Sequence, residues 1–208
     1  MTYFNFDNDY RMRGNVYLVG IDEAGRGPLA GPLVVAAVIL PPTFNDERIK
    51  DSKQLNTAQL SILSDVIKEA ALDYTIATMS PSEIDTLNIY QATRVLMLRA
   101  LTNLMHEYHF VLTDAMPLGT LNVGHESIIK GDAQSLSIAA ASILAKVARD
   151  EAMVALHDLY PQYDFLHHKG YPTKGHLEAL KLYGPIKDVH RYSYKPVQEA
   201  LNEQIKLF

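Results

Sequence analysis

Residues 16–40 read VYLVGIDEAGRGPLAGPLVVAAVIL, and they contain two apolar stretches separated by a loop rich in glycine and proline. Residues 16–22 are rich in β-branched and aromatic side chains, which predicts a short strand. Residues 33–40 form the longest apolar run of the chain, and Pro41 and Pro42 end it. This run predicts a second strand that is buried.

Helical and strand patterns alternate through the rest of the chain. Further strands are expected at residues 74–79, 109–113 and 127–130. Helices are expected at residues 57–72, 80–105, 134–159, 173–183 and 196–205. Strands grouped early and then alternating with helices predict an α/β fold with a mixed sheet. The length of 208 residues favours a single domain, with residues 1–15 as a polar N-terminal tail.

Composition excludes several classes of protein. The chain has no cysteine, which excludes disulfides, thiolate nucleophiles and cysteine-bound zinc, and fits a reducing compartment. Its longest apolar run is too short to cross a bilayer, which needs about 20 residues, and residues 1–15 do not resemble a secretory signal. We therefore expect a cytoplasmic protein without a membrane partner. The net charge of -5 argues, on its face, against a nucleic-acid partner.

Four carboxylates lie at or just past the ends of expected strands. Asp22 ends the first strand and Glu23 follows it, Asp114 follows the strand at 109–113, and Asp132 precedes the helix at 134–159. Singly, each is most often a turn or cap residue. If the four converge, they would repel one another unless cations bind, and their oxygens suit Mg²⁺ or Mn²⁺. Two such ions about 3.5–4 Å apart can activate water and stabilise the leaving oxygen of a phosphodiester.

The loop Gly25-Arg26-Gly27 follows the first two acids directly. Its glycines allow a ligand to approach the backbone closely, and an arginine beside two acids suggests phosphate and metal together. The spacing does not match a dinucleotide-binding loop or a P-loop.

Residues 161–196 carry a local basic excess of six basic against three acidic side chains, with Tyr171 and four histidines among them. No zinc-binding spacing is present, and we interpret the region as a polar, mildly basic surface. Basic side chains interleaved with an aromatic ring suit a sugar-phosphate backbone. This local excess weakens the objection raised by the net charge.

The stretch from Gly20 to Pro32 resembles the signature of the ribonuclease HII family. The resemblance continues through DSKQL at 51–55, EIDTLNI at 83–89, KGD at 130–132, AAASILAK at 139–146, Arg149-Asp150, HKGYPTK at 168–174 and His190-Arg191. It covers roughly residues 16–197. It implies an RNase H-like fold, with a central five-stranded mixed sheet flanked by helices and a helical C-terminal part from about residue 160 to 208.

The resemblance also implies a function and a set of site residues. The family cuts the RNA strand of RNA/DNA hybrids and incises on the 5′ side of a ribonucleotide embedded in duplex DNA, leaving 3′-hydroxyl and 5′-phosphate ends. Such duplexes would be the partners of this chain, which we expect to be a monomer. The implied catalytic and metal-binding residues, for two Mg²⁺ or Mn²⁺ ions, are Asp22, Glu23, Asp114 and Asp132. The implied substrate-binding residues are Gly25, Arg26 and Gly27 at the ribose 2′-hydroxyl, Tyr171 at the RNA–DNA junction and Lys53 at a phosphate.

The chain departs from the common pattern of this family at two places. Ala-Met-Pro-Leu follows Asp114 where many members have Gly-Asn, and Tyr194 stands where Phe is frequent. The sister family, ribonuclease HIII, typically lacks the arginine of the glycine loop, so Arg26 favours HII. Two more hypotheses remain open, namely a nucleic-acid-binding module with an inactive nuclease fold and a related nuclease that acts on DNA junctions.

Overall fold

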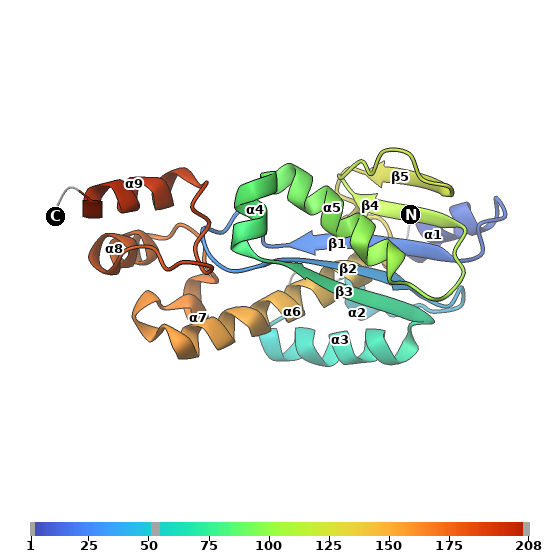
Figure 1. Ribbon diagram of the computed structural model, residues 1–208. Coiled ribbons are helices and arrows are strands. Elements are labelled where there is room, and N and C mark those ends of the chain that lie inside the picture. The colour runs from blue at the N-terminus through green and yellow to red at the C-terminus, as the bar shows by residue number, and fades with distance from the viewer. Residues whose placement is uncertain (1–2, 51–54, 206–208) are drawn as a thin grey trace. The chain divides into compact units, whose positions relative to one another are not determined.

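The computed structural model describes residues 3–50 and 55–205, which fold into two compact units (Figure 1). The first, here called the sheet unit, comprises Met1–Ala24, Val34–Ala77 and Thr93–Val147. The second, the helical unit, comprises Gly25–Leu33, Thr78–Ala92 and Ala148–Phe208. Lys53 lies outside the described residues.

A five-stranded mixed sheet has the order β3-β2-β1-β4-β5. Its central strand β1 (Leu18–Ala24) pairs antiparallel with β2 (Leu33–Ile39) and parallel with β4 (Phe110–Asp114). β4 pairs parallel with β5 (Gly124–Ile128), and β3 (Asp73–Met79) lies beside β2 at the other edge. The expected α/β class and mixed sheet are confirmed. Two strands differ most from the expectation. β1 continues through Ala24 and therefore contains Asp22 and Glu23 rather than ending at Asp22, and the strand expected at 127–130 is β5, which begins at Gly124 and ends at Ile128.

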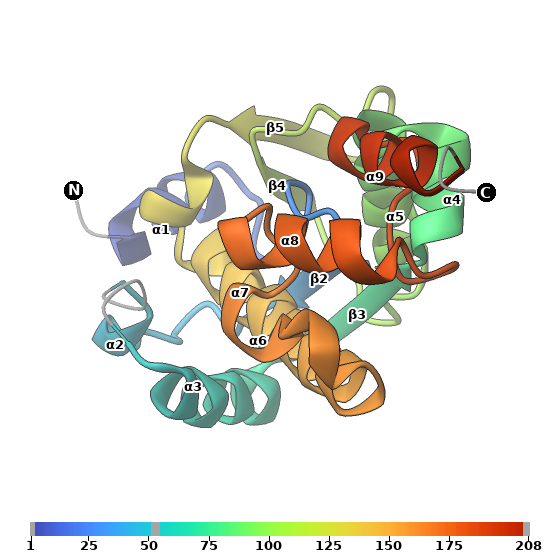
Figure 2. The same cartoon turned by 90° about the vertical axis from the view of Figure 1, so that its left-hand side faces the viewer.

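Helices cover both faces of the sheet. The helices are α1 (Tyr3–Arg11), α2 (Glu47–Lys50), α3 (Thr57–Ala70), α5 (Ile89–Thr102) and α6 (Leu136–Leu159). In both views α5 lies on one face of the sheet, and α3 and α6 lie on the other (Figures 1 and 2). Every residue of β2 is consequently buried, as is usual for a strand covered on both faces. α6 touches the backbone of β1, since a Cβ atom added to Gly20 would lie 2.1 Å from the carbonyl carbon of Ser137.

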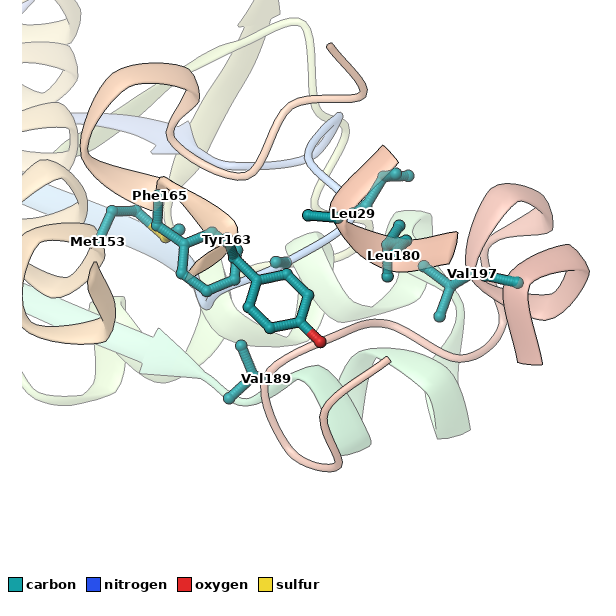
Figure 3. Packing of buried hydrophobic residues seen from close by; sticks show 10 residues of the cluster. Leu29, Met153, Tyr163, Phe165, Leu180, Val189 and Val197 are labelled. Carbon is teal, nitrogen blue, oxygen red and sulfur yellow. The ribbon is translucent and has the colours of Figure 1, made fainter. Parts of the chain in front are cut away.

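The helical unit has a core of its own. It contains α4 (Pro81–Leu87), the 3-10 turn η3 (Pro161–Tyr163), α7 (Phe165–His168), α8 (Lys174–Tyr183) and α9 (Lys195–Ile205). Figure 3 shows this core, in which seven labelled buried side chains pack together: Leu29, Met153, Tyr163, Phe165, Leu180, Val189 and Val197. None of the helices in residues 3–50 and 55–205 has the length and apolar character that crossing a membrane requires.

A break at Asn88 divides the helix that was expected at residues 80–105. The backbone of Asn88 has a φ of 62°, which ends α4, and its Oδ1 accepts hydrogen bonds from the amides of Tyr90 and Gln91 at 3.1 Å. Asparagine tolerates a positive φ better than most residues and is a good helix N-cap. The prediction of a single long helix was therefore wrong. It was made because the apolar periodicity of the sequence continues across residue 88.

The N-terminal segment packs against the sheet unit through Asp7. Residues 3–11, expected within a polar tail, form α1, on which Asp7 is fully buried. Its Oδ2 accepts hydrogen bonds from the amide of Ser137 at 2.9 Å and from the Ser137 hydroxyl at 2.7 Å. Asp7 therefore caps the first turn of α6, where backbone amides lack partners within the helix. Burial raises the pKa of Asp7, and its hydrogen bonds to Ser135 and Ser137 oppose that effect.

We expect Asp7→Ala to lower the free energy of unfolding by about 1–2 kcal/mol, the usual loss when a helix cap is removed. Urea unfolding followed by circular dichroism measures this change. Asp9→Ala on the same helix is the matched control, because Asp9 is partly exposed. Equal losses in the two variants would contradict a capping role for Asp7.

Candidate active site

The parallel pairing of β1 and β4 brings two of the expected acids side by side. The register aligns Ile21 with Thr113, so the next residues along the two strands are Asp22 and Asp114. Both lie toward the carboxyl ends of neighbouring parallel strands, which is where α/β proteins commonly place their ligands. Glu23 follows Asp22 within β1.

Asp22 is a buried carboxylate with other negative charges close to it. Its side chain is only 6% exposed. Burial raises the pKa of Asp22 well above its ordinary value, and the charges of Glu23 and, more weakly, Asp114 raise it further. Hydrogen bonds from Ser142 and from the Glu23 amide, at 2.7 Å, oppose this effect and orient the carboxylate. Glu23 and Asp114 thus both lie within electrostatic range of Asp22, and a cation there would relieve this repulsion.

The fourth acid is connected to this group through Gly131. The amide of Gly131 donates a hydrogen bond of 2.7 Å to Oδ1 of Asp114, and Asp132 is the next residue, in the 3-10 turn η2 (Gly131–Ala133). Asp132 lines a cavity of about 300 Å³ together with Ser142 and Lys146. The remaining lining residues are apolar: Leu55, Leu60, Ala139 and Ile143. Because Ser142 also binds Asp22, the cavity lies beside that carboxylate.

The donor set fits a hard divalent cation in its chemistry. All four side chains offer carboxylate oxygens, which Mg²⁺ and Mn²⁺ prefer, and Asp22 carries repulsion that a cation would remove. Among residues 3–50 and 55–205, no three Asp, Glu or His side chains lie close enough to hold a metal ion by themselves.

The glycine loop lies in the helical unit and needs glycine at Gly25. The φ of Gly25 is 100°, and a Cβ atom there would lie 2.2 Å from Nε of Arg149. Arg26 and Gly27, by contrast, are exposed. The loop is therefore packed at its first residue and accessible at the next two.

Arg191 anchors this loop from inside the helical unit. It is fully buried, and its guanidinium donates to the carbonyl oxygens of Gly25 at 2.6 Å, Arg26 at 3.0 Å and Gly31 at 3.0 Å. The hydroxyl of Tyr194 donates a further hydrogen bond of 2.7 Å to the Arg26 carbonyl. In a trans peptide the N–H points opposite to the C=O. The amides of Arg26 and Gly27 therefore point away from Arg191.

A second buried arginine supports the same segments. Arg149 donates to the carbonyl oxygens of Ala30 at 3.2 Å and Lys169 at 2.9 Å. Burial, and secondly the charge of Arg191, lower the pKa of Arg149 to about 10. Sequence reasoning assigned no role to Arg149 and placed Arg191 on a basic surface. The signal available was their presence in the two short motifs Arg149-Asp150 and His190-Arg191.

The prediction of a basic surface over residues 161–196 is therefore wrong in part. Arg191, His176 and His190 are buried, because backbone carbonyls and neighbouring rings satisfy their polar atoms inside the helical unit. The lysines at 174, 181, 187 and 195 are exposed, as expected.

Tyr171 lies beside the glycine loop within the helical unit. Its side chain is 49% exposed, and a Cβ atom added to Gly27 would lie 3.4 Å from Cε1 of the Tyr171 ring. The structure thus brings Gly27 and Tyr171 together. Lys53 lies outside the described residues, so its expected phosphate contact stays a prediction.

Sequence comparison finds one family along most of the chain. The model of the ribonuclease HII family matches residues 19–197. Ribonuclease HII of Listeria innocua is 51% identical over 195 residues, which cover 94% of this chain and 74% of the relative. Ribonuclease HII of Desulfitobacterium hafniense is 49% identical over 191 residues, which cover 92% of this chain and 73% of the relative.

Solved structures agree with this result. The ribonuclease H2 of Pyrococcus horikoshii matches with a TM-score of 0.78 and 26% identity, over 91% of this chain and 98% of the other. The RNase HII of Archaeoglobus fulgidus, in a structure of its complex with PCNA, matches with a TM-score of 0.65 and 26% identity, over 86% and 95% of the two chains. A Bst-RNase HIII structure in complex with Mn²⁺ matches with a TM-score of 0.75 at 20% identity, over 90% and 70%, which shows a shared fold. The expected RNase H-like fold is confirmed.

Proposed function

Because the chain belongs to the ribonuclease HII family, and is therefore a ribonuclease that acts on RNA/DNA, we propose that it incises duplex DNA on the 5′ side of a single embedded ribonucleotide. The same reaction on longer hybrids would cut the RNA strand. The observation that carries the proposal is the register of β1 and β4, which places the buried Asp22 beside Asp114.

The carboxylates of the sheet unit are the proposed catalytic groups. Asp22, Glu23, Asp114 and Asp132 would hold Mg²⁺ or Mn²⁺, which activates water and stabilises the leaving oxygen of a phosphodiester when two ions are bound. Ser142 and the Glu23 amide orient the Asp22 carboxylate, and the Gly131 amide fixes Oδ1 of Asp114. These bonds pre-organise the oxygens, so little side-chain rearrangement is needed when the substrate binds.

The glycine loop and Tyr171 are the proposed recognition groups. The 2′-hydroxyl is the group that distinguishes RNA from DNA at one nucleotide. The amides of Arg26 and Gly27, which point away from Arg191, would hydrogen-bond to it without reading a base. The exposed ring of Tyr171 would stack on the sugar at the RNA–DNA junction. The exposed lysines of residues 161–196 would contact phosphates, which makes binding sensitive to salt.

An end-labelled DNA duplex with one embedded ribonucleotide tests this function. In Mg²⁺ or Mn²⁺ we expect a single nick that leaves a 3′-hydroxyl on the preceding deoxynucleotide and a 5′-phosphate on the ribonucleotide. An all-DNA duplex of the same sequence is the control, and its cleavage would support a DNA-junction nuclease instead. Retention of the duplex without cleavage at any metal concentration would support an inactive binding module and overturn the proposal.

A further inference from the structure

Three histidines in the helical unit have no part in the reaction described above. His176 and His190 are buried, with exposed fractions of 0% and 1%, and His168 stacks on His176 with ring centroids 4.4 Å apart. The side chains around them are those of the apolar core, including Tyr163 and Phe165. Polar rings in such a core need partners for their nitrogens, and these partners define how the rings are protonated.

The hydrogen bonds of His176 and His190 permit one arrangement of protons. The amide of Ile186 donates to Nδ1 of His190 at 3.0 Å, so this nitrogen carries no proton and Nε2 of the neutral ring does. Nε2 of His190 lies 3.2 Å from Nε2 of His176, which must then be the acceptor. Nδ1 of His176 consequently carries a proton and donates to the carbonyl of Tyr171 at 3.0 Å. The result is a directional chain from Ile186 through both rings to Tyr171.

His168 holds the other side of Tyr171. The amide of Gly170 donates to Nδ1 of His168 at 3.1 Å, so its Nε2 carries the proton and donates to the carbonyl of Tyr163 at 2.6 Å. The amide of Tyr171 donates to the carbonyl of His168 at 2.9 Å. The peptide groups on both sides of Tyr171 are thus held by a histidine residue, although the Tyr171 side chain itself is half exposed.

The two buried rings are kept neutral. Burial lowers the pKa of His176 to about 4 and that of His190 to about 3. For His190, the charge of His176 is the second largest cause that lowers the pKa. An added proton on His176 would place two N–H groups against each other across the 3.2 Å contact between the rings. An added proton on His190 would place an N–H group against the Ile186 amide. An apolar pair of similar size would fill this core without such constraints, so packing alone does not require two linked imidazoles.

We propose that His176 and His190 are positioning residues that hold the Tyr171 backbone by this directional chain and thereby set the preference for the RNA–DNA junction. The inference rests on the proposed role of Tyr171 in the function above. The chain of hydrogen bonds ends on the carbonyl of Tyr171, and Tyr171 is the residue whose exposed aromatic ring lies beside Gly27. A small displacement of that carbonyl would be transmitted to the ring, because the two share one Cα atom.

The test compares two substrates and four variants. For each protein, kcat/KM is measured on a duplex with one ribonucleotide and on a hybrid with a continuous RNA strand, and the ratio of the two reports junction preference. We expect His176→Leu to lower the ratio roughly 10-fold, the effect of one lost positioning hydrogen bond. His176→Asn should restore most of it, because the Asn amide nitrogen takes the place of Nδ1. Val197→Ala, in the same core, should lower the melting temperature and leave the ratio unchanged.

Tyr171→Ala separates failure of this inference from failure of the proposed function. If Tyr171→Ala leaves the ratio unchanged, the role of Tyr171 itself is wrong. If Tyr171→Ala lowers the ratio but His176→Leu changes it no more than Val197→Ala does, the positioning role alone is wrong. Ring ¹⁵N chemical shifts of the wild-type protein give an independent readout that holds even if His176→Leu does not fold. We expect a proton on Nδ1 of His176 and on Nε2 of His190, and the opposite tautomers would overturn the proposal.

Discussion

Asp22→Asn is expected to lower the rate of RNA cleavage at least ~10³-fold, while the metal-free variant is at least as stable as the wild-type protein. The loss of activity follows from the position of Asp22 beside Asp114, a second of the proposed catalytic carboxylates. An amide keeps the shape of the side chain but removes the negative charge that a divalent cation requires.

The expected stability follows from the direction of the pKa shift. Burial, with the charges of Glu23 and Asp114, raises the pKa of Asp22, so the folded state holds its proton more tightly than the unfolded state. Stability therefore falls as the pH rises above about 3.9, where unfolded Asp ionises. The Asn side chain does not ionise and avoids this loss at neutral pH.

Thermal unfolding with EDTA and with added Mg²⁺ or Mn²⁺ measures this effect, alongside single-turnover cleavage. Metal should raise the melting temperature of the wild-type protein and change that of Asp22→Asn much less, because ligands stabilise only the state that binds them. Asp65→Asn, at an exposed acid on α3, is the control and should behave as the wild type. Full cleavage by Asp22→Asn would remove Asp22 from the catalytic group.

Arg191→Met is expected to lower the free energy of unfolding by about 3–5 kcal/mol. The substitution leaves the carbonyls of Gly25 and Gly31 without their guanidinium donor, and each buried acceptor that loses its partner costs about 1–3 kcal/mol. Relief of the charge repulsion with Arg149 offsets part of this loss. Because the glycine loop is anchored through Arg191, we also expect a higher KM for a duplex with an embedded ribonucleotide.

Tyr194→Phe is the graded control for this experiment. It removes a hydroxyl that donates to the Arg26 carbonyl and accepts from Arg191, so a loss of about 1 kcal/mol is expected. Guanidinium chloride unfolding measures both variants. If Arg191→Met unfolds at the same denaturant concentration as Tyr194→Phe, the buried guanidinium does not anchor the loop.

Sequence pattern predicted four of the five strands to within two residues, because their signal is local, and placed the start of β5 three residues too late. The apolar run at residues 33–40 corresponds to β2, and the acids were recognised because each ends or follows an apolar stretch. The convergence of Asp22 and Asp114 could not be derived in this way. It depends on the pairing of β1 with β4, which is a contact between segments far apart in the chain.

Buried polar residues account for most of what the sequence did not predict. Arg191, His176 and Asp7 all have polar side chains, and an interpretation from residue type alone places such side chains on the surface. Their hydrogen-bond partners come from other elements, and for two of them from far along the chain: the carbonyl of Gly31 for Arg191, Ser137 for Asp7, and His190 for His176. Asn88 shows the same limit for helices, since its positive φ ends α4 within the span that was expected to be one helix.

The neighbours of β1 in the sheet also have a consequence for the order of folding. Residues 25–32 join β1 to β2, so the loop that closes this antiparallel pair is much shorter than the one that closes β1 against β4, and it costs less entropy. Pairing of β1 with β4 must instead wait until residue 113 meets residue 21, a long loop closure that slows folding. We therefore expect a chain emerging from the ribosome to form the β1–β2 hairpin first and to acquire nuclease activity only after β4 has been synthesised and added to the sheet.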